Sequence, residues 1–179
     1  MTLNSLEILR KLHYDFYSFK EEAIEPEQVE LKLSDLLPLL KEGGERSRAI
    51  ADCKLYKHQH EALAALRSGE NVILISGTGS GKTESWFLYC ALEGVRALAV
   101  YPTLALANDQ IIRIRDYSST LGLSAEVIDA RRRDLLAKKL GMNGLRSFLS
   151  GLDILITNPA FLLSDMKKWL GGRSLLYPF

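Results

Sequence analysis

Residues 74–83 decide the fold of this chain, and they read Leu-Ile-Ser-Gly-Thr-Gly-Ser-Gly-Lys-Thr. An apolar run breaks here into closely spaced glycines and then into a Lys-Thr pair that can open a helix. Glycines let backbone N–H groups turn inward around phosphate oxygens, and the helix N-terminus adds about half a positive charge. Lys82 can reach the β- and γ-phosphates, and the Thr83 hydroxyl can ligate Mg²⁺. The stretch therefore predicts a phosphate loop that binds a nucleoside triphosphate with Mg²⁺.

The strict form of this motif has a glycine five places before Gly81, where this chain has Ser76. Extra glycines stand at positions 77 and 79. A glycine-rich turn without a ligand is the alternative. We expect the nucleotide to lie against a continuous run of residues: Gly77, Thr78, Gly79, Ser80, Gly81, Lys82, Thr83 and Glu84.

Composition points to an ordinary globular protein, because the 179 residues are 47% hydrophobic and 25% charged. The first 50 residues hold 7 basic and 10 acidic side chains, so they carry a charge of −3, whereas the remainder carries +4. That excess alone does not identify a nucleic acid as partner. Cys53 and Cys90 lack the spacing of a metal or redox site, and no apolar run approaches about 18 residues. We expect a cytoplasmic protein without a membrane partner.

The N-terminal region predicts a helical extension over residues 1–50, followed by the main domain over residues 51–179. Apolar side chains recur every three or four residues, which is typical of an amphipathic helix that packs its apolar stripe on a neighbour: Leu3, Leu6, Leu9, Leu12, Phe16 and Phe19. Pro26 interrupts this pattern. Residues 31–40 predict a second short helix, and the two glycines at 43–44 end it.

From residue 57 onward, apolar runs alternate with helical patterns. A helix is expected from His58 to Arg67, and strands are expected at 72–76, 97–101, 125–129 and 152–156. The runs are continuous rather than alternating in polarity, as in parallel strands covered by helices on both faces. The fold class is therefore α/β, with a doubly wound parallel sheet. Ligands of such sheets bind beyond the carboxyl ends of the strands.

Gln59 lies 23 residues before Lys82 and offers a second nucleotide contact. Its carboxamide can donate and accept one hydrogen bond at the same time, which suits the edge of adenine. Tyr56 could supply an aromatic face or simply pack. A solvated helix cap is the plain alternative for Gln59.

Four segments together resemble the first RecA-like domain of superfamily 2 helicases. They are LYKHQ at 55–59, SGTGSGKTES at 76–85, YPTLALANDQ at 101–110 and ITNPAFLL at 156–163, in the order of the Gln motif and motifs I, Ia and Ib. The resemblance is greatest to the DExH helicases of archaea and bacteria and covers about residues 50–165. It implies a P-loop ATPase motor in which Gln59 contacts adenine and the loop holds ATP and Mg²⁺.

The resemblance also implies contacts to single-stranded DNA or RNA from residues that follow two expected strands: Pro102, Thr103, Thr157, Asn158 and Pro159. Locally, a helix cap and a turn explain these residues equally well. Arg131, Arg132 and Arg133 could bind a polyanion or form a solvated helix face beside Asp134. The preceding Ile-Asp-Ala at 128–130 departs from the Gly-Asp-Thr element that is common in the family.

The sequence contains neither Asp-Glu-x-His nor Asp-Glu-Ala-Asp, the family's carboxylate motif, and no second RecA-like domain. We therefore expect weak nucleotide binding and negligible hydrolysis by this chain alone. The remaining helicase domains would lie in the same or a second polypeptide, and an incomplete sheet should expose apolar surface. Two other classes stay open, namely another P-loop enzyme such as a small-molecule kinase and a non-catalytic nucleotide- or nucleic-acid-binding module.

Overall fold

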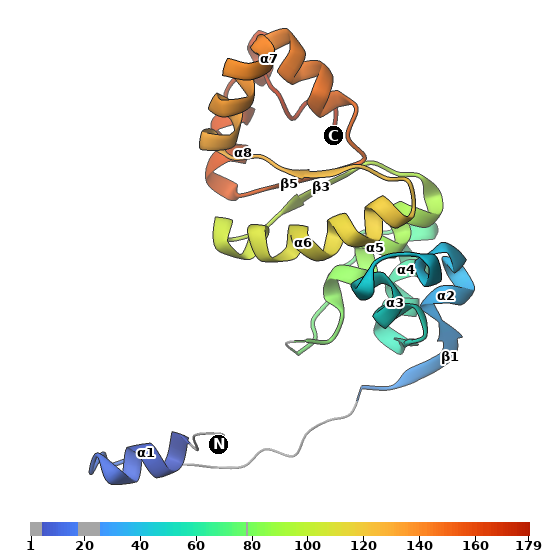
Figure 1. Cartoon of the computed structure of the whole chain (residues 1–179), viewed down its shortest axis with the longest axis vertical. Helices are drawn as coiled ribbons and strands as arrows, with labels where there is room; N and C mark the ends of the chain where they lie inside the picture. The colour runs from blue at the N-terminus through green and yellow to red at the C-terminus, as the bar shows by residue number, and fades with distance from the viewer. Residues whose placement is uncertain (1–4, 18–25, 78) are drawn as a thin grey trace.

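The computed structural model describes residues 5–17, 26–77 and 79–179 (Figure 1). The elements in chain order are α1 (Ser5–Lys11), β1 (Gln28–Lys32), α2 (Leu33–Leu36), η1 (Pro38–Glu42), α3 (Glu45–Ala51), β2 (Lys54–Tyr56), α4 (Lys57–Arg67), α5 (Lys82–Glu93), β3 (Ala97–Val100), α6 (Leu104–Thr120), β4 (Ala125–Val127), α7 (Ala130–Ser150), β5 (Ile154–Thr157), α8 (Pro159–Met166) and η2 (Trp169–Gly171).

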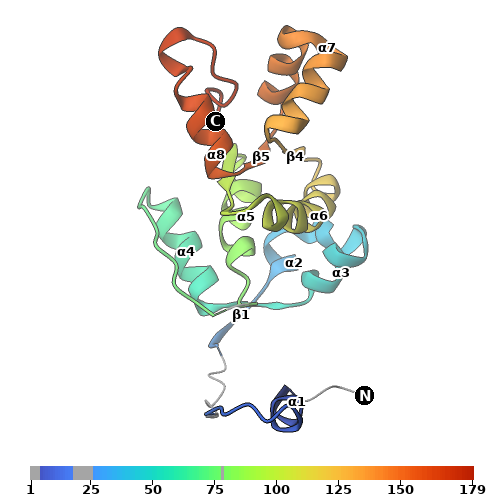
Figure 2. The ribbon, with the colours of Figure 1, turned by 90° about the vertical axis from the view of Figure 1, so that its left-hand side faces the viewer.

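A parallel sheet in the order β3-β5-β4 forms the centre of the molecule. In the central strand, Ile154 and Ile156 point into a core shared with α5 and α6, whereas Leu155 points into a second core with α7 and α8. Figures 1 and 2 show these helix pairs on opposite faces of the sheet. Burial on both faces explains why the strand is continuously apolar, and the predicted α/β class is confirmed.

The strand predicted at 72–76 is wrong, because these residues form no strand and belong to no sheet in the described structure. Ile73 and Ile75 are 90% and 91% exposed. A strand needs a neighbour for its backbone hydrogen bonds, and β3 pairs with β5 alone among the described residues. The other three predicted strands are confirmed as β3, β4 and β5, with ends shifted by a few residues.

The N-terminal predictions need correction. The helix α1 ends at Lys11, and Leu12 is 60% exposed, so the predicted packing of the apolar stripe is wrong for this side chain. Leu3 and Phe19 lie outside the described residues. The helix predicted at 31–40 is divided between β1, α2 and η1, because Pro38 cannot donate a helical hydrogen bond.

Residues 28–51 pack closely against the α/β domain. The strand β1 pairs with β2 in an antiparallel ribbon. Leu33, Leu40 and Ala51 share one apolar core with α5 and α6. A boundary near residue 50 remains a prediction, and it separates segments that bury their apolar side chains together.

Candidate nucleotide-binding site

Backbone carbonyl groups of the glycine-rich loop accept hydrogen bonds from the lysine that follows the loop. Lys82 is the first residue of α5, and its Nζ donates to the carbonyl oxygens of Ser76 at 3.0 Å and Gly77 at 2.5 Å. The Ser80 hydroxyl donates to the same Gly77 oxygen at 2.8 Å and lies 2.6 Å from the Ser76 hydroxyl. The ammonium group thus lies within the loop, where phosphate oxygens of a nucleotide would compete with two carbonyls. Thr78 lies outside the described residues.

The first turn of α4 contacts this loop directly. Gln59 is buried, donates from Nε2 to the Gly81 oxygen at 2.9 Å and accepts from the Tyr56 backbone N–H at 2.9 Å. His58 Nε2 lies 2.8 Å from the Ser80 oxygen, and its ring stacks on Tyr56 with centroids 5.5 Å apart. The structure therefore brings Gln59 and Tyr56 to the loop as predicted. The sequence analysis missed His58, although its place beside Gln59 was a usable signal.

A cavity of about 1120 Å³ lies between the loop and the open edge of the sheet, and α4, α5, β3 and α6 line it. Glu84 is the only carboxylate among the described residues around this cavity. The volume suffices for a nucleotide-sized ligand. Its wall along β3 is mostly apolar, since Ala97, Leu98, Ala99 and Val100 all border it.

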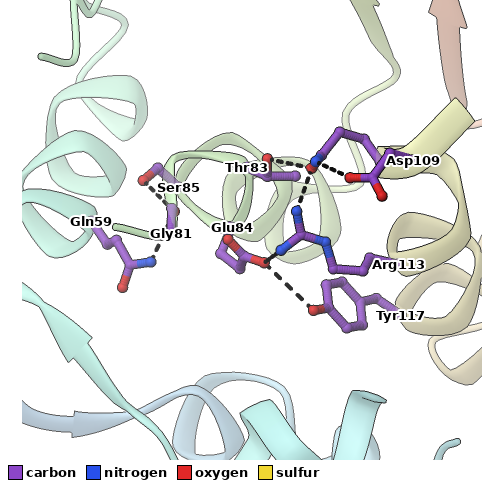
Figure 3. A network of polar contacts seen from close by, with 9 residues as sticks. Gln59, Gly81, Thr83, Glu84, Ser85, Asp109, Arg113 and Tyr117 are labelled. Carbon is purple, nitrogen blue, oxygen red and sulfur yellow. Dashed lines mark hydrogen bonds and ion pairs between the residues drawn. The ribbon is translucent and has the colours of Figure 1, made fainter. Parts of the chain in front are cut away.

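A partly buried polar network joins the start of α5 to α6 (Figure 3). The Thr83 hydroxyl donates to Gln110 Oε1 at 3.0 Å, and Arg113 Nη2 donates to the same oxygen at 2.8 Å. Arg113 also lies 3.8 Å from the Glu84 carboxylate, which accepts from the Tyr117 hydroxyl at 3.5 Å. Burial, with the nearby charge of Glu84, raises the pKa of Tyr117 to about 12. Glu84 thus faces its protein partners, and Gln110 was missed as a site residue although it ends the quoted segment 101–110.

Thr157 is the last residue of β5, and the other residues predicted to hold nucleic acid follow β3 or β5, which are neighbours in the sheet. Thr103 caps α6 by accepting from the Leu106 N–H at 3.2 Å, and Asn158 caps α8 by accepting from the Phe161 N–H at 2.8 Å. Thr157 is fully buried and donates to the Ile128 oxygen at 2.7 Å.

Pro102 and Pro159 are exposed next to these caps. The structure brings both segments to one edge of the sheet, and local capping accounts for the side chains of Thr103 and Asn158. Two of the three consecutive arginines are paired, Arg132 with Glu126 at 3.2 Å and Arg133 with Asp134 at 2.7 Å.

Neither a metal-binding cluster of His, Cys, Asp and Glu nor a helix long and apolar enough to cross a membrane occurs among residues 5–17, 26–77 and 79–179.

Among proteins of similar sequence, the ATP-dependent helicase YprA of Bacillus subtilis is 29% identical over 128 residues. The match covers 65% of this chain and 16% of YprA. The ATP-dependent helicase MJ1574 of Methanocaldococcus jannaschii is 30% identical over 122 residues, which are 64% of this chain and 17% of that protein. The chain thus spans less than a fifth of either relative.

Solved structures show the same fold. The helicase MrfA bound to DNA superposes with a TM-score of 0.65 and 24% identity, over 86% of this chain and 20% of MrfA. MrfA bound to DNA and AMPPNP gives a TM-score of 0.62 and 22% identity, over 94% of this chain and 23% of MrfA. A model of the DEAD/DEAH box helicase family matches residues 56–176, which is most of the chain. The chain therefore belongs to this family of ATP-dependent helicases.

Proposed function

We propose that this chain is the ATP-binding part of a motor that hydrolyses ATP in response to single-stranded DNA or RNA. One observation carries the proposal. The lysine-containing loop and the buried Gln59 line the same cavity as Val100, the last residue of β3, and the helix caps Thr103 and Asn158 follow β3 and its neighbour β5. This is the edge at which α/β proteins bind their ligands.

For the nucleotide, we propose that Lys82 exchanges the Ser76 and Gly77 carbonyls for phosphate oxygens. The N-terminus of α5 adds its partial positive charge. The Thr83 hydroxyl would hold Mg²⁺, which would neutralise phosphate charge when bound. Gln59 would turn one end of its amide from the protein backbone to adenine.

For the nucleic acid, we propose that the exposed Thr103 hydroxyl and backbone groups at 102–103 and 157–159 hold successive phosphates of one strand. Contacts of this kind do not read bases, which suits a motor that moves along any sequence. Thr157 would act indirectly, because its hydroxyl is used in the bond to Ile128 that fixes the turn.

We propose that hydrolysis requires groups that the described residues around the cavity do not offer. A carboxylate must orient the attacking water, and Glu84, the one carboxylate that the described residues contribute to the cavity, faces Arg113 and Tyr117. An arginine that neutralises the transferring phosphate contributes roughly 10³ to 10⁵ in rate. We propose that further helicase domains, in the same or another polypeptide, supply both groups and cover the open edge of β3.

The test is ATP turnover by the complete polypeptide, or by this chain with its completing partner, measured with and without single-stranded DNA and RNA. We expect strong stimulation by nucleic acid. Turnover that ignores nucleic acid but responds to a small phosphate acceptor would indicate a kinase, and binding without turnover would indicate a non-catalytic module. Either result overturns the proposal.

Lys82→Ala tests the site independently of the reaction. Losing the only phosphate-loop cation should weaken ATP binding by about tenfold or more, since hydrogen bonds to charged groups contribute about 1.5–3 kcal/mol. Binding of a fluorescent ATP analogue measures the loss. Unchanged affinity would show that the nucleotide binds elsewhere.

A further inference from the structure

Gln110 makes a contact that the proposed ATP site does not explain. Its side chain is buried, and it comes from α6 rather than from the loop itself. Its Oε1 accepts the hydrogen of the Thr83 hydroxyl at 3.0 Å. A hydroxyl group has one hydrogen and two lone pairs. While Gln110 accepts this hydrogen bond, the lone pairs of Thr83 Oγ1 remain available to another ligand.

Arg113 fixes which way round the Gln110 amide lies. A guanidinium group can only donate, so the amide atom 2.8 Å from Arg113 Nη2 must be the oxygen. The amide nitrogen then donates to Asp109 Oδ2 at 3.0 Å. Since Oε1 can only accept, Thr83 must be the donor, and its hydrogen points toward α6. The Glu84 carboxylate, 3.8 Å from Arg113, holds the guanidinium in place.

We propose that Gln110 is a positioning residue for the Mg²⁺ complex of ATP. It turns the hydrogen of Thr83 away from the nucleotide, so that an oxygen lone pair faces the cation. Arg113 keeps the Gln110 oxygen, rather than its nitrogen, toward Thr83. The inference depends on the proposed function, because it assumes that Thr83 ligates the metal.

The test compares binding of a fluorescent ATP analogue to the full chain with Mg²⁺ and with EDTA. Gln110→Leu keeps the approximate size of the side chain but removes the acceptor. We expect it to reduce the gain in affinity due to Mg²⁺ about fivefold, as for the loss of one hydrogen bond, and to leave the affinity in EDTA unchanged. Gln110→Glu keeps an acceptor oxygen and should retain most of the gain. Asn108→Ala, at an exposed position on the same helix, is the matched control.

A double-mutant comparison separates this inference from the proposed function. Thr83→Val should abolish the Mg²⁺-dependent gain, and adding Gln110→Leu should then change nothing further. If Thr83→Val keeps the full Mg²⁺-dependent gain in affinity, the metal is held elsewhere and the proposed role of Thr83 is wrong. If Thr83→Val loses this gain but Gln110→Leu keeps it, the proposed role of Gln110 is wrong, whereas the proposed role of Thr83 is supported. Equal losses with Mg²⁺ and EDTA would indicate a merely structural effect and would also overturn the inference.

Discussion

Gly81 lies where the phosphate loop joins α5 and contacts Gln59. Two structural features require a glycine there, namely its backbone conformation and the close approach of Gln59. Its backbone is left-handed, with φ of +73°, and a Cβ atom there would lie 2.2 Å from Gln59 Nε2. We expect Gly81→Ala to cost about 1 kcal/mol or more for the backbone, to displace Gln59, and to reduce ATP affinity. Thermal unfolding and nucleotide binding measure the two effects.

Gly79 is the matched control, because its φ of +79° is equally left-handed but nothing lies within 4 Å of an added Cβ. Gly79→Ala should show the backbone cost alone. Equal destabilisation by both substitutions would show that the contact between Gly81 and Gln59 contributes nothing.

The sequence could predict which side chains have the chemistry to bind a nucleotide, but it could not predict their hydrogen-bond partners. The loop residues and Gln59 come together as expected. The roles of His58 and Gln110 depend on which way their side chains point, and the packing of α4 and α6 determines that. For Thr157, the resemblance to helicases implied a contact to nucleic acid, whereas the fold uses its hydroxyl to bond Ile128.

The helix α6 begins with a threonine cap, and this cap lies at the proposed nucleic-acid edge. Thr103 accepts from the Leu106 N–H, which has no partner within the helix. We expect Thr103→Ala to destabilise the protein by about 1 kcal/mol and Thr103→Ser to restore most of that loss. Thermal unfolding measures the cap, and the affinity of the complete polypeptide for single-stranded DNA measures the proposed contact.

These measurements distinguish the role of Thr103 as a helix cap from its proposed role as a contact to nucleic acid. A stability loss without any change in DNA affinity would leave Thr103 as a cap alone. Undiminished stability in Thr103→Ala would contradict the cap itself.

Elements held together by their own hydrogen bonds could be predicted well. The helix α4 begins one residue before its predicted start and ends at Arg67, because its bonds are internal. The segment 72–76 has the composition of a strand, yet a strand exists only through its neighbours. The helix predicted at 31–40 is wrong at its start, where residues 31–32 belong to β1, and at Pro38, which separates α2 from η1.

The molecule as a whole has an open side. One edge of β3 has no strand partner in the described structure, and residues 72–75 expose two isoleucines almost completely. The cavity that the loop residues 79–83 line is also walled by β3. Open edges and exposed apolar segments favour association. Since the chain spans less than a fifth of YprA and MJ1574, we expect further polypeptide to cover this side.

The exposed isoleucines offer a direct test of that expectation. We expect the isolated chain to self-associate and to bind an apolar fluorescent dye, and the double variant Ile73→Lys with Ile75→Lys to reduce both without lowering the unfolding temperature. Ile112→Lys, at a position 52% exposed on α6, should change neither as strongly. In the complete polypeptide the same double variant should lower the unfolding temperature, because each buried isoleucine contributes about 1.5–3 kcal/mol. If the isolated chain is monomeric and monodisperse and binds no dye, the expectation that further polypeptide covers this side is wrong.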